Sequence, residues 1–254
     1  MRLTEHTRAL LAEGCGTFMF VTIGAGAIVT DAQTEGAVGL VGIALAHGLA
    51  LAIAVSVFGA ISGGHLNPVV TFALAVARKH PWDRVLTYWG AQLAGALVAG
   101  IAIILFFDFA PAAAEQTRLG TPVLGEGVSG AAAILVEAVL TIFLVWAVFG
   151  TAVSPNAPRI AGFGIGLIVA ADILIGGPLT GAAMNPARWF GPAVASRFFD
   201  NGLVYWIGPL LGAGIAGLTY RYIFASDVER EPIPTPAAPP SAPASDRTQP
   251  MERD

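Results

Sequence analysis

The chain has 254 residues, of which 55% are hydrophobic and only 12% are charged. Soluble domains are typically about 25% charged, so this composition indicates a protein that crosses the membrane several times. The formal net charge of −4 is small and scattered, which argues against a nucleic-acid partner. The one cysteine, Cys15, excludes an intrachain disulfide framework.

Six apolar runs are long enough to cross an apolar layer of about 30 Å. They cover residues 9–30, 37–60, 86–109, 130–153, 160–177 and 202–224. The first run is too long for the core of a signal peptide and has no convincing cleavage site, so we predict a span. Six spans place both termini on one side of the membrane. Most Lys and Arg residues fall on that side, which predicts that it is cytoplasmic.

A short motif occurs twice between the apolar runs, 118 positions apart, as Asn67-Pro68-Val69 and Asn185-Pro186-Ala187. Asparagine is a favourable N-cap residue, and proline suits the first helical position. Polar residues follow each motif after about ten positions, so the helices predicted at 68–78 and 186–197 are about 15 Å long. That length is half of the bilayer's apolar thickness, which indicates two re-entrant half-helices.

Other features recur in the same order as the motifs. Glu13 in the first run is matched by Glu137 in the fourth, and the pair at 88–89 is matched by the pair at 205–206. These matches predict two repeats, 9–109 and 130–224, each with three spans and one half-helix, joined by an outer loop at 110–129. Three spans are an odd number, so the second repeat is inverted and the two half-helices meet near the midplane. The predicted fold is therefore an all-α membrane protein with six transmembrane helices.

The two ends of the chain lie outside the repeats. Residues 1–8 are predicted to be a cytoplasmic N-terminus. Residues 225–254 are rich in proline and poor in apolar side chains, which predicts a disordered cytoplasmic tail.

At these motifs the sequence closely resembles the aquaporin, or major intrinsic protein, family. The resemblance covers about residues 9–224 and rests on Ala12-Glu13 with Gly16-Thr17, Ser62-Gly63-Gly64-His65, the two Asn-Pro motifs with Arg188, Ala91-Gln92-Leu93 and Glu137. It implies a right-handed six-helix bundle with one pore per subunit, usually in a homotetramer, and passive conduction of water or small neutral solutes. The family usually has alanine at position 69. The extra methyl groups of Val69 lie near the meeting point of the half-helices, which puts the pore's width there in question.

The pore centre is predicted to lie at the paired asparagines. A single Asn-Pro pair is normally only a turn or a cap, but two at equivalent repeat positions favour a function. Asn67 and Asn185 can each cap a helix and direct an amide N–H into the pore, while both helix N-termini add partial positive charge. Cations are repelled there, and a water held by both amides cannot easily accept a proton from its neighbour. The carbonyl groups of segments 62–66 and 181–184 are predicted to supply acceptors.

The selectivity filter is predicted to include Arg188, three residues after Asn185. In isolation such an arginine could snorkel or be paired, but beside the motif we interpret it as a donor and cation barrier. By family spacing the other filter positions are His47, Ile173 and Ala182. This set resembles that of the plant tonoplast intrinsic proteins, a subgroup implied to pass water with ammonia and sometimes urea. We expect Arg188, and His47 when protonated, to repel ammonium.

Three further buried polar residues need an interpretation. His65 is predicted to line the cytoplasmic vestibule, the alternative being a structural contact. Glu13 and Glu137 could form a proton relay in a transporter, but their matched placement favours a buttress that accepts hydrogen bonds from the backbone before each half-helix. Asp172 has no counterpart in the other repeat, and we assign it no role.

The function predicted from these features is a passive channel for water, ammonia or other small neutral solutes, embedded in membrane lipid, with no cofactor and no metal. A glycerol facilitator is the first alternative, although Trp189 follows Arg188 where that group usually has aspartate. An ion-coupled secondary transporter with broken helices is the second. No pattern for an enzyme's active site is present. Twelve arginines to one lysine, with abundant alanine, favour a bacterial plasma (inner) membrane.

Overall fold

The structure is a computed structural model that describes residues 3–158, 160 and 162–226. Within these residues all regular structure is helical. The α-helices are α1 (Glu5–Gln33), α2 (Gly39–Ser62), α3 (Pro68–Val76), α4 (Val85–Phe106), α5 (Pro111–Gln116), α6 (Gly130–Val148), α7 (Gly162–Thr180), α8 (Pro186–Ser196) and α9 (Val204–Thr219). Shorter turns are the 3₁₀ segments η1 (Trp82–Arg84) and η2 (Arg118–Gly120) and the π-helical segments η3 (Phe149–Val153) and η4 (Tyr220–Phe224).

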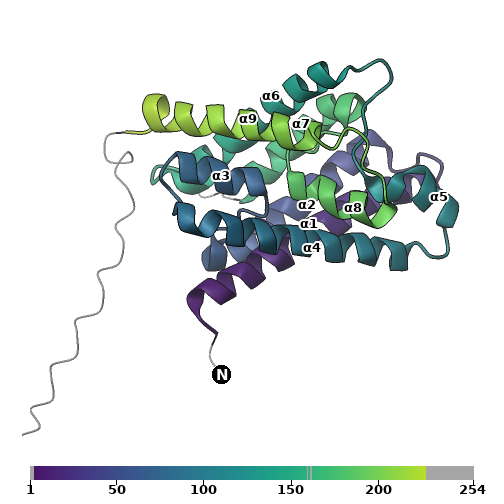
Figure 1. The fold of residues 1–254 in the computed structure, drawn as a ribbon, viewed down its shortest axis with the longest axis horizontal. Coiled ribbons are helices and arrows are strands. Elements are labelled where there is room, and N and C mark those ends of the chain that lie inside the picture. Colours follow the sequence, from purple (N-terminus) through teal and green to yellow (C-terminus); the bar gives the residue numbers. More distant parts are fainter. Residues whose placement is uncertain (1–2, 159, 161, 227–254) are drawn as a thin grey trace, which may run out of the picture.

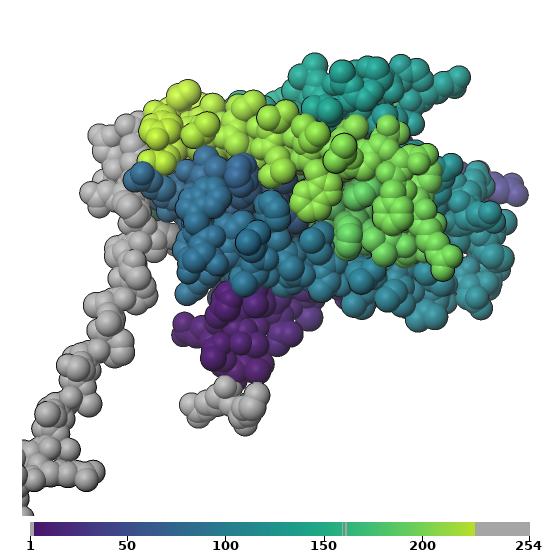
Figure 2. All heavy atoms as spheres, in the orientation of Figure 1, coloured from purple at the N-terminus to yellow at the C-terminus, as the bar shows by residue number. Residues whose placement is uncertain are grey.

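The long helices run side by side, and the short helices α3 and α8 lie between them, one toward each end of the bundle (Figure 1). The start of α1 and the end of η4 lie at the same end as α3, whereas α5 lies at the end that holds α8. Following the predicted topology, we call the α5 end the outer end. Both half-helices reach the face shown in Figure 2, where α8 packs on α4 and α3 packs on α9.

Five helical segments in the described part of the chain are long and apolar enough to cross a membrane: Glu5–Gln33, Gly39–Ser62, Trp82–Phe106, Gly130–Val153 and Gly162–Thr180. The sixth predicted run corresponds to α9, which has 16 residues and continues directly into η4. At about 1.5 Å per residue, α9 and η4 together reach about 30 Å. Large apolar side chains cover the outside of α9, as membrane lipid requires: Ile207, Leu211, Ile215 and Leu218.

Small residues set the helix spacing inside the bundle. A Cβ atom added to Gly95 on α4 would collide with the Gly14 carbonyl on α1. In the second repeat, a Cβ atom added to Gly212 on α9 would collide with the Ala138 carbonyl on α6. Helices in lipid associate through such close backbone contacts, because lipid tails offer no hydrophobic driving force between them. The two repeats therefore use glycine at equivalent contacts.

The half-helices begin with the predicted caps. The Asn67 side chain accepts a hydrogen bond from the Val69 N–H (3.0 Å), and the Asn185 side chain accepts from the Ala187 N–H (2.9 Å) and the Arg188 N–H (3.3 Å). The predicted ends, 78 and 197, lie one or two residues beyond the observed ends at 76 and 196. In each case the last predicted residue is left-handed and stops the helix (φ of 61° and 58°).

Other predicted boundaries differ from the structure. Helix α1 already begins at Glu5, because the Thr4 hydroxyl caps it by accepting from the Thr7 N–H (3.1 Å). The outer loop at 110–129 contains α5 and η2, and is thus partly helical. Of the predicted tail, only residues 225–226 belong to the described residues, so the prediction of disorder falls outside them.

Candidate pore and selectivity filter

The two asparagines are joined across the centre of the molecule. Asn67 Nδ2 donates to the Met184 carbonyl (2.9 Å), and Asn185 Nδ2 donates to the Leu66 carbonyl (3.0 Å). An amide nitrogen carries two hydrogens. Each asparagine donates one of them to the opposite repeat, and the second is left to donate to a molecule in the pore. Sequence reasoning missed this crossed pair. Leu66 and Met184 directly precede the asparagines, and both are left-handed (φ of 51° and 50°).

A narrow cavity of about 20 Å³ runs past these asparagines. A water needs roughly 10–15 Å³ of such space, so the cavity has room for about one water. Its polar lining comes from the segments before the half-helices, from the two asparagines and from His47 on α2, and the remaining lining is apolar. The lining residues are Phe20, His47, Leu51, Val55, Gly64, His65, Asn67, Val70, Leu144, Val148, Ile165, Val169, Ile173, Ala182, Ala183, Met184 and Asn185.

Val69 does not have the effect on pore width that the sequence suggested. Its side chain is fully buried in the main apolar cluster, and it is the next residue, Val70, that lines the narrow cavity. Successive residues of a helix point about 100° apart, so only one of the two can face the lumen. The extra methyl groups at position 69 therefore contribute to packing.

The predicted filter residues lie where the narrow cavity opens into an outer vestibule of about 530 Å³. His47 and Ile173 line both spaces, Ala182 lines the narrow one, and Arg188 lines the vestibule. The structure thus brings the four residues together from α2, α7, the segment before α8, and α8 itself.

Arg188 is the charged member of the group and is only 1% exposed. Its Nε donates to His47 Nε2 (3.1 Å), and its Nη1 donates to the Gly120 carbonyl (2.8 Å). Its Nη2 has no hydrogen-bond partner among the described residues. Two of its nitrogens therefore fix the side chain, and the third keeps its hydrogens without a protein partner.

His47 is held in one neutral tautomer. Its Nδ1 lies 2.9 Å from the Ile43 carbonyl, which can only accept a hydrogen bond, so Nδ1 carries the hydrogen. The Arg188 Nε can only donate, so His47 Nε2 is the acceptor. Repulsion of ammonium by a protonated His47 stays a prediction. In this geometry the positive side-chain charge belongs to Arg188 alone.

Glu13 is fully buried and holds the segment before α3. Its Oε1 accepts from the Ser62 hydroxyl (2.6 Å) and the His65 N–H (2.9 Å). Its Oε2 accepts from the Leu66 N–H and from Gln92 Nε2, both at 2.7 Å. These four donors occupy the carboxylate from two sides, and the backbone before the half-helix is tied to α1 and α4.

Glu137 has the same position in the second repeat and is also fully buried. Its Oε1 accepts from the Thr180 hydroxyl (2.7 Å) and the Ala183 N–H (2.9 Å), and its Oε2 accepts from the Met184 N–H (2.7 Å). This carboxylate has three donors. It ties the backbone before α8 to α6.

Comparison with known proteins places this architecture in a family. The sequence profile described as Major intrinsic protein matches residues 1–220. The chain belongs to the major intrinsic protein family. It is accordingly an integral, multi-pass membrane protein and a passive channel of the aquaporin type, which conducts water and small solutes.

Similar proteins cover nearly the whole chain. Aquaporin TIP1-2 of Zea mays is 42% identical over 242 residues, which are 92% of each chain. The probable aquaporin TIP3-2 of Arabidopsis thaliana is 41% identical, over 90% of this chain and 88% of its own. The aquaglyceroporin of Plasmodium falciparum has a similar fold, with a TM-score of 0.78 over 86% of this chain and 97% of its own. At 22% identity, that likeness concerns the fold alone.

In this major intrinsic protein, His65 lies at the inner part of the narrow cavity. Its Nδ1 is 3.0 Å from the Thr71 hydroxyl, which also receives a hydrogen bond from Gln92 Nε2 (3.0 Å). The ring also packs against His80 and Tyr88, with centroids 4.8 Å and 5.1 Å away. Burial, and next the neighbouring His65, lower the pKa of His80 to about 4. His65 thus combines a place in the pore wall with structural contacts.

One part of the site had no signal in the sequence analysis. The Gly120 carbonyl was missed, because backbone acceptors leave no residue pattern and the loop around it has no periodicity. Asp172 is buried on α7, and its Oδ2 has no hydrogen-bond partner among the described residues.

Proposed function

We propose that this channel conducts water together with neutral ammonia, and that His47, Ile173, Ala182 and Arg188 form its selectivity filter. The observation that carries the proposal is the position of Arg188, held by His47 and the Gly120 carbonyl beside the apolar Ile173. The free Nη2 of Arg188 donates to a molecule that offers a lone pair.

Ammonia suits such a filter because it needs fewer hydrogen bonds than water. It has one lone pair, which Arg188 Nη2 can satisfy, and its own hydrogens lose little against an apolar wall at Ile173. Ammonium has no lone pair to offer and carries the same charge as the guanidinium. The electrostatic barrier therefore rejects the ion and passes the base.

Protons and ions are excluded at the pore centre in this proposal. One amide hydrogen remains on each of Asn67 and Asn185 after the crossed bonds to the opposite repeat. The N-termini of α3 and α8 add partial positive charge at the same place. A water that accepts from both amides is turned so that it cannot relay a proton along the file.

The alternatives fit the sequence and the geometry less well. A glycerol facilitator is less well supported, because Trp189 follows Arg188 where that group usually has aspartate. An ion-coupled transporter would need a titrating carboxylate at the solute site, whereas Glu13 and Glu137 are occupied by four and three hydrogen-bond donors. We therefore propose that both glutamates are structural buttresses and that the protein has no enzymatic activity.

The proposed setting is a homotetramer in a bacterial inner membrane, with both termini in the cytoplasm. The support for the tetramer is family membership. The distribution of arginines supports the orientation. The ratio of arginine to lysine supports a bacterial inner membrane. The two relatives named above by sequence come from plants, so the bacterial setting rests on composition.

Reconstituted vesicles test the proposed function. Water efflux and ammonia uptake would be followed by stopped-flow light scattering and by an internal pH dye, with glycerol as a third solute and protein-free vesicles as the control. We expect water and ammonia fluxes well above bare lipid and glycerol flux at its level. Ammonia flux no faster than bare lipid, in vesicles that conduct water well, would reduce the protein to a plain water channel.

A further inference from the structure

The structure assigns a positioning role to Arg118, outside the predicted filter. We propose that its guanidinium, stacked on Phe198, anchors the outer loop to the half-helix α8 and so keeps the Gly120 carbonyl on Arg188. This inference rests on Arg188 as the filter arginine and is independent of whether ammonia passes.

The contact between Arg118 and Phe198 is close. The Arg118 Cζ lies 3.6 Å from the centre of the Phe198 ring. Phe198 follows the end of α8, and its N–H donates to the Ala193 carbonyl (3.0 Å), which ties the ring's backbone to the half-helix. A guanidinium over an aromatic face is attracted by the ring's quadrupole, and arginine also stacks its plane on the ring. The loop is thereby attached to the C-terminal end of α8.

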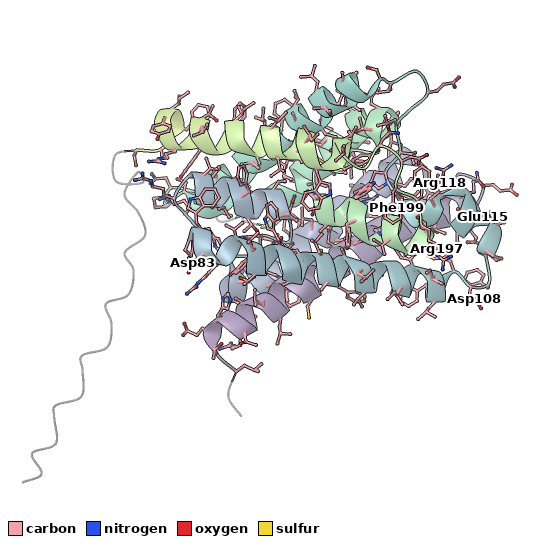
Figure 3. The ribbon with its side chains drawn as sticks, viewed as in Figure 1. Asp83, Asp108, Glu115, Arg118, Arg197 and Phe199 are labelled. Atoms are coloured by element: carbon pink, nitrogen blue, oxygen red, sulfur yellow. The ribbon has the colours of Figure 1, made fainter. Side chains whose placement is uncertain are left out.

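The two side chains lie at the outer end of the molecule. Both line the outer vestibule and a groove of about 490 Å³ beside it. Figure 3 shows Arg118 near Arg197 and Phe199, at the opposite end of the bundle from Asp83. The anchor is therefore placed above the filter and away from the pore centre.

The loop that Arg118 belongs to has an unfavourable backbone. Arg118, Leu119 and Gly120 are all left-handed, with φ of 52°, 56° and 74°. Non-glycine residues adopt this conformation at a cost in free energy, and such a run persists only when its surroundings fix it. Leu119 is buried among apolar side chains, and the Thr121 hydroxyl donates to the Arg118 carbonyl (2.6 Å).

The position of Gly120 leaves no room for drift toward α1. A Cβ atom on Gly120 would lie 2.5 Å from the Ala25 carbonyl oxygen, so the loop backbone rests directly on α1. From there the Gly120 carbonyl reaches Arg188 in the first turn of α8, while Arg118 holds Phe198 just beyond the last turn. One short loop therefore fastens both ends of the helix that carries the filter arginine.

Loss of this fastening should act on permeation through Arg188. Without the Gly120 carbonyl, the guanidinium would be held only by its bond to His47. It could then turn into the passage, where the next cavity has a volume of only about 20 Å³. Each molecule would meet a higher barrier, even in a correctly folded channel.

Four variants separate this role from a simple effect of charge. Arg118→Gln removes the cation, Phe198→Leu removes the ring and keeps the charge, and the double variant removes both. Arg197→Gln is the matched control, because Arg197 is an exposed arginine that lines the same groove and has no ring or hydrogen-bond contact from its side chain among the described residues. Water permeability per channel and its activation energy would be measured in vesicles with counted channels.

We expect Arg118→Gln and Phe198→Leu each to lower water permeability per channel about two- to fivefold, and to raise the activation energy. The double variant should be no worse than either single one, because all three break one contact. Arg197→Gln should behave like the wild type. A purely structural role would reduce the number of folded channels and leave the activation energy unchanged.

Three results would overturn the proposal. They are an unchanged activation energy in both single variants, additive losses in the double variant, or an equal loss in Arg197→Gln, which would assign the effect to charge at the mouth. The readout is water alone. Failure of the wild type to pass ammonia would therefore leave this test of Arg118 intact. Failure of the Arg118 proposal would likewise leave the proposed ammonia conduction untouched.

Discussion

In both repeats a buried glutamate accepts backbone N–H groups just before the half-helix, and a tyrosine hydroxyl donates to a carbonyl of the same segment. The Tyr88 hydroxyl donates to the Ser62 carbonyl and the Tyr205 hydroxyl to the Thr180 carbonyl, each at 2.9 Å. The equivalent asparagines then cross to the opposite repeat. These contacts hold irregular backbone at a depth where lipid cannot satisfy it.

The repeats differ in the side chains around this shared frame. The first has Gln92 and Thr71 bonded in a chain that reaches His65. At the position equivalent to Gln92, the second repeat has Pro209, which has no side-chain polar group. The second repeat instead carries Arg188, fixed by groups from outside its own repeat. The repeated contacts therefore form the shared frame, and the proposed selectivity depends on Arg188, which only the second repeat carries.

The largest expected effect is on stability, from replacing the buttress of the second repeat. Glu137→Gln would put an amide N–H₂ opposite the Met184 N–H, and Pro209 offers no acceptor for it. In Glu13→Gln, the Oε1 of Gln92, which lacks a partner, can turn to accept from the new amide. Each buried donor left unpaired costs about 1–3 kcal/mol, so Glu137→Gln should lower the thermal unfolding temperature more.

The measurement is thermal unfolding of the two purified variants in the same detergent. Equal losses would contradict the proposed difference between the repeats. Water conduction by the folded fraction of both variants should survive and stay independent of a pH gradient, since neither carboxylate is proposed to relay protons.

A smaller effect is expected on ion exclusion at the pore centre. Asn67→Asp and Asn185→Asp each replace a donor amide by an anion, which weakens the positive potential of the two helix N-termini. Position 185 is in the first turn that also carries Arg188, whose charge offsets part of the new anion. We therefore expect more cation leak from Asn67→Asp, measured as ionic conductance in planar bilayers. Equal or absent leak in folded channels would refute this account of the centre.

The sequence predicted the frame because its signals are local or repeated. Asparagine followed by proline defines a helix start by itself, and Glu13 and Glu137 were found by matching the two copies. The direction of the Val69 side chain could not be predicted from local or repeated signals. A shift of one position along a helix is enough to move a side chain from the lumen to the core. That depends on how α3 is rotated against its neighbours.

The outer loop was the part that sequence reasoning could not resolve. It has no repeat partner, its key acceptor is the Gly120 carbonyl, and its left-handed residues at 118–120 include only one glycine. The state of His47 also depended on contacts with Ile43 and Arg188 that no spacing reveals. A family resemblance can name a filter residue without saying which of its atoms remain free.

A further change tests the apolar wall of the filter. Ile173→His would replace the apolar side chain by a hydrogen-bonding ring, in a filter that already contains His47 from the first repeat. The larger ring would also narrow the opening. Ammonia gains less than water from extra hydrogen-bond partners, so its flux should fall more than water flux does. Paired stopped-flow measurements would give the ratio of the two permeabilities, with Ile173→Val as the control that keeps the wall apolar. An unchanged ratio in Ile173→His would remove Ile173 from the filter.

The smallest effect is a dependence of stability on pH at the inner end of the first repeat. His80 lies between α3 and η1 and packs on His65 and Tyr88, with centroids 4.8 Å and 4.6 Å away. Its pKa falls from an ordinary 6.5 to about 4, through burial first and His65 second. The folded state therefore binds this proton less readily than the unfolded state does. The contribution to stability is present above about pH 6.5 and is lost as the pH falls toward 4.

The comparison that isolates this contribution is thermal unfolding of wild type and His80→Gln between pH 8 and 4. Other carboxylates also destabilise acidified proteins, but they are common to both chains and cancel in the difference. We expect the two unfolding temperatures to converge as the pH falls through this window. Only the wild type has a histidine that must stay neutral in the folded state, so only the wild type loses this contribution to stability. The second repeat has no histidine after α8, so no matching term arises at the outer end. A constant difference from pH 8 to 4 would show that His80 titrates alike in the folded and unfolded chains, and that its ring contacts do not restrict protonation.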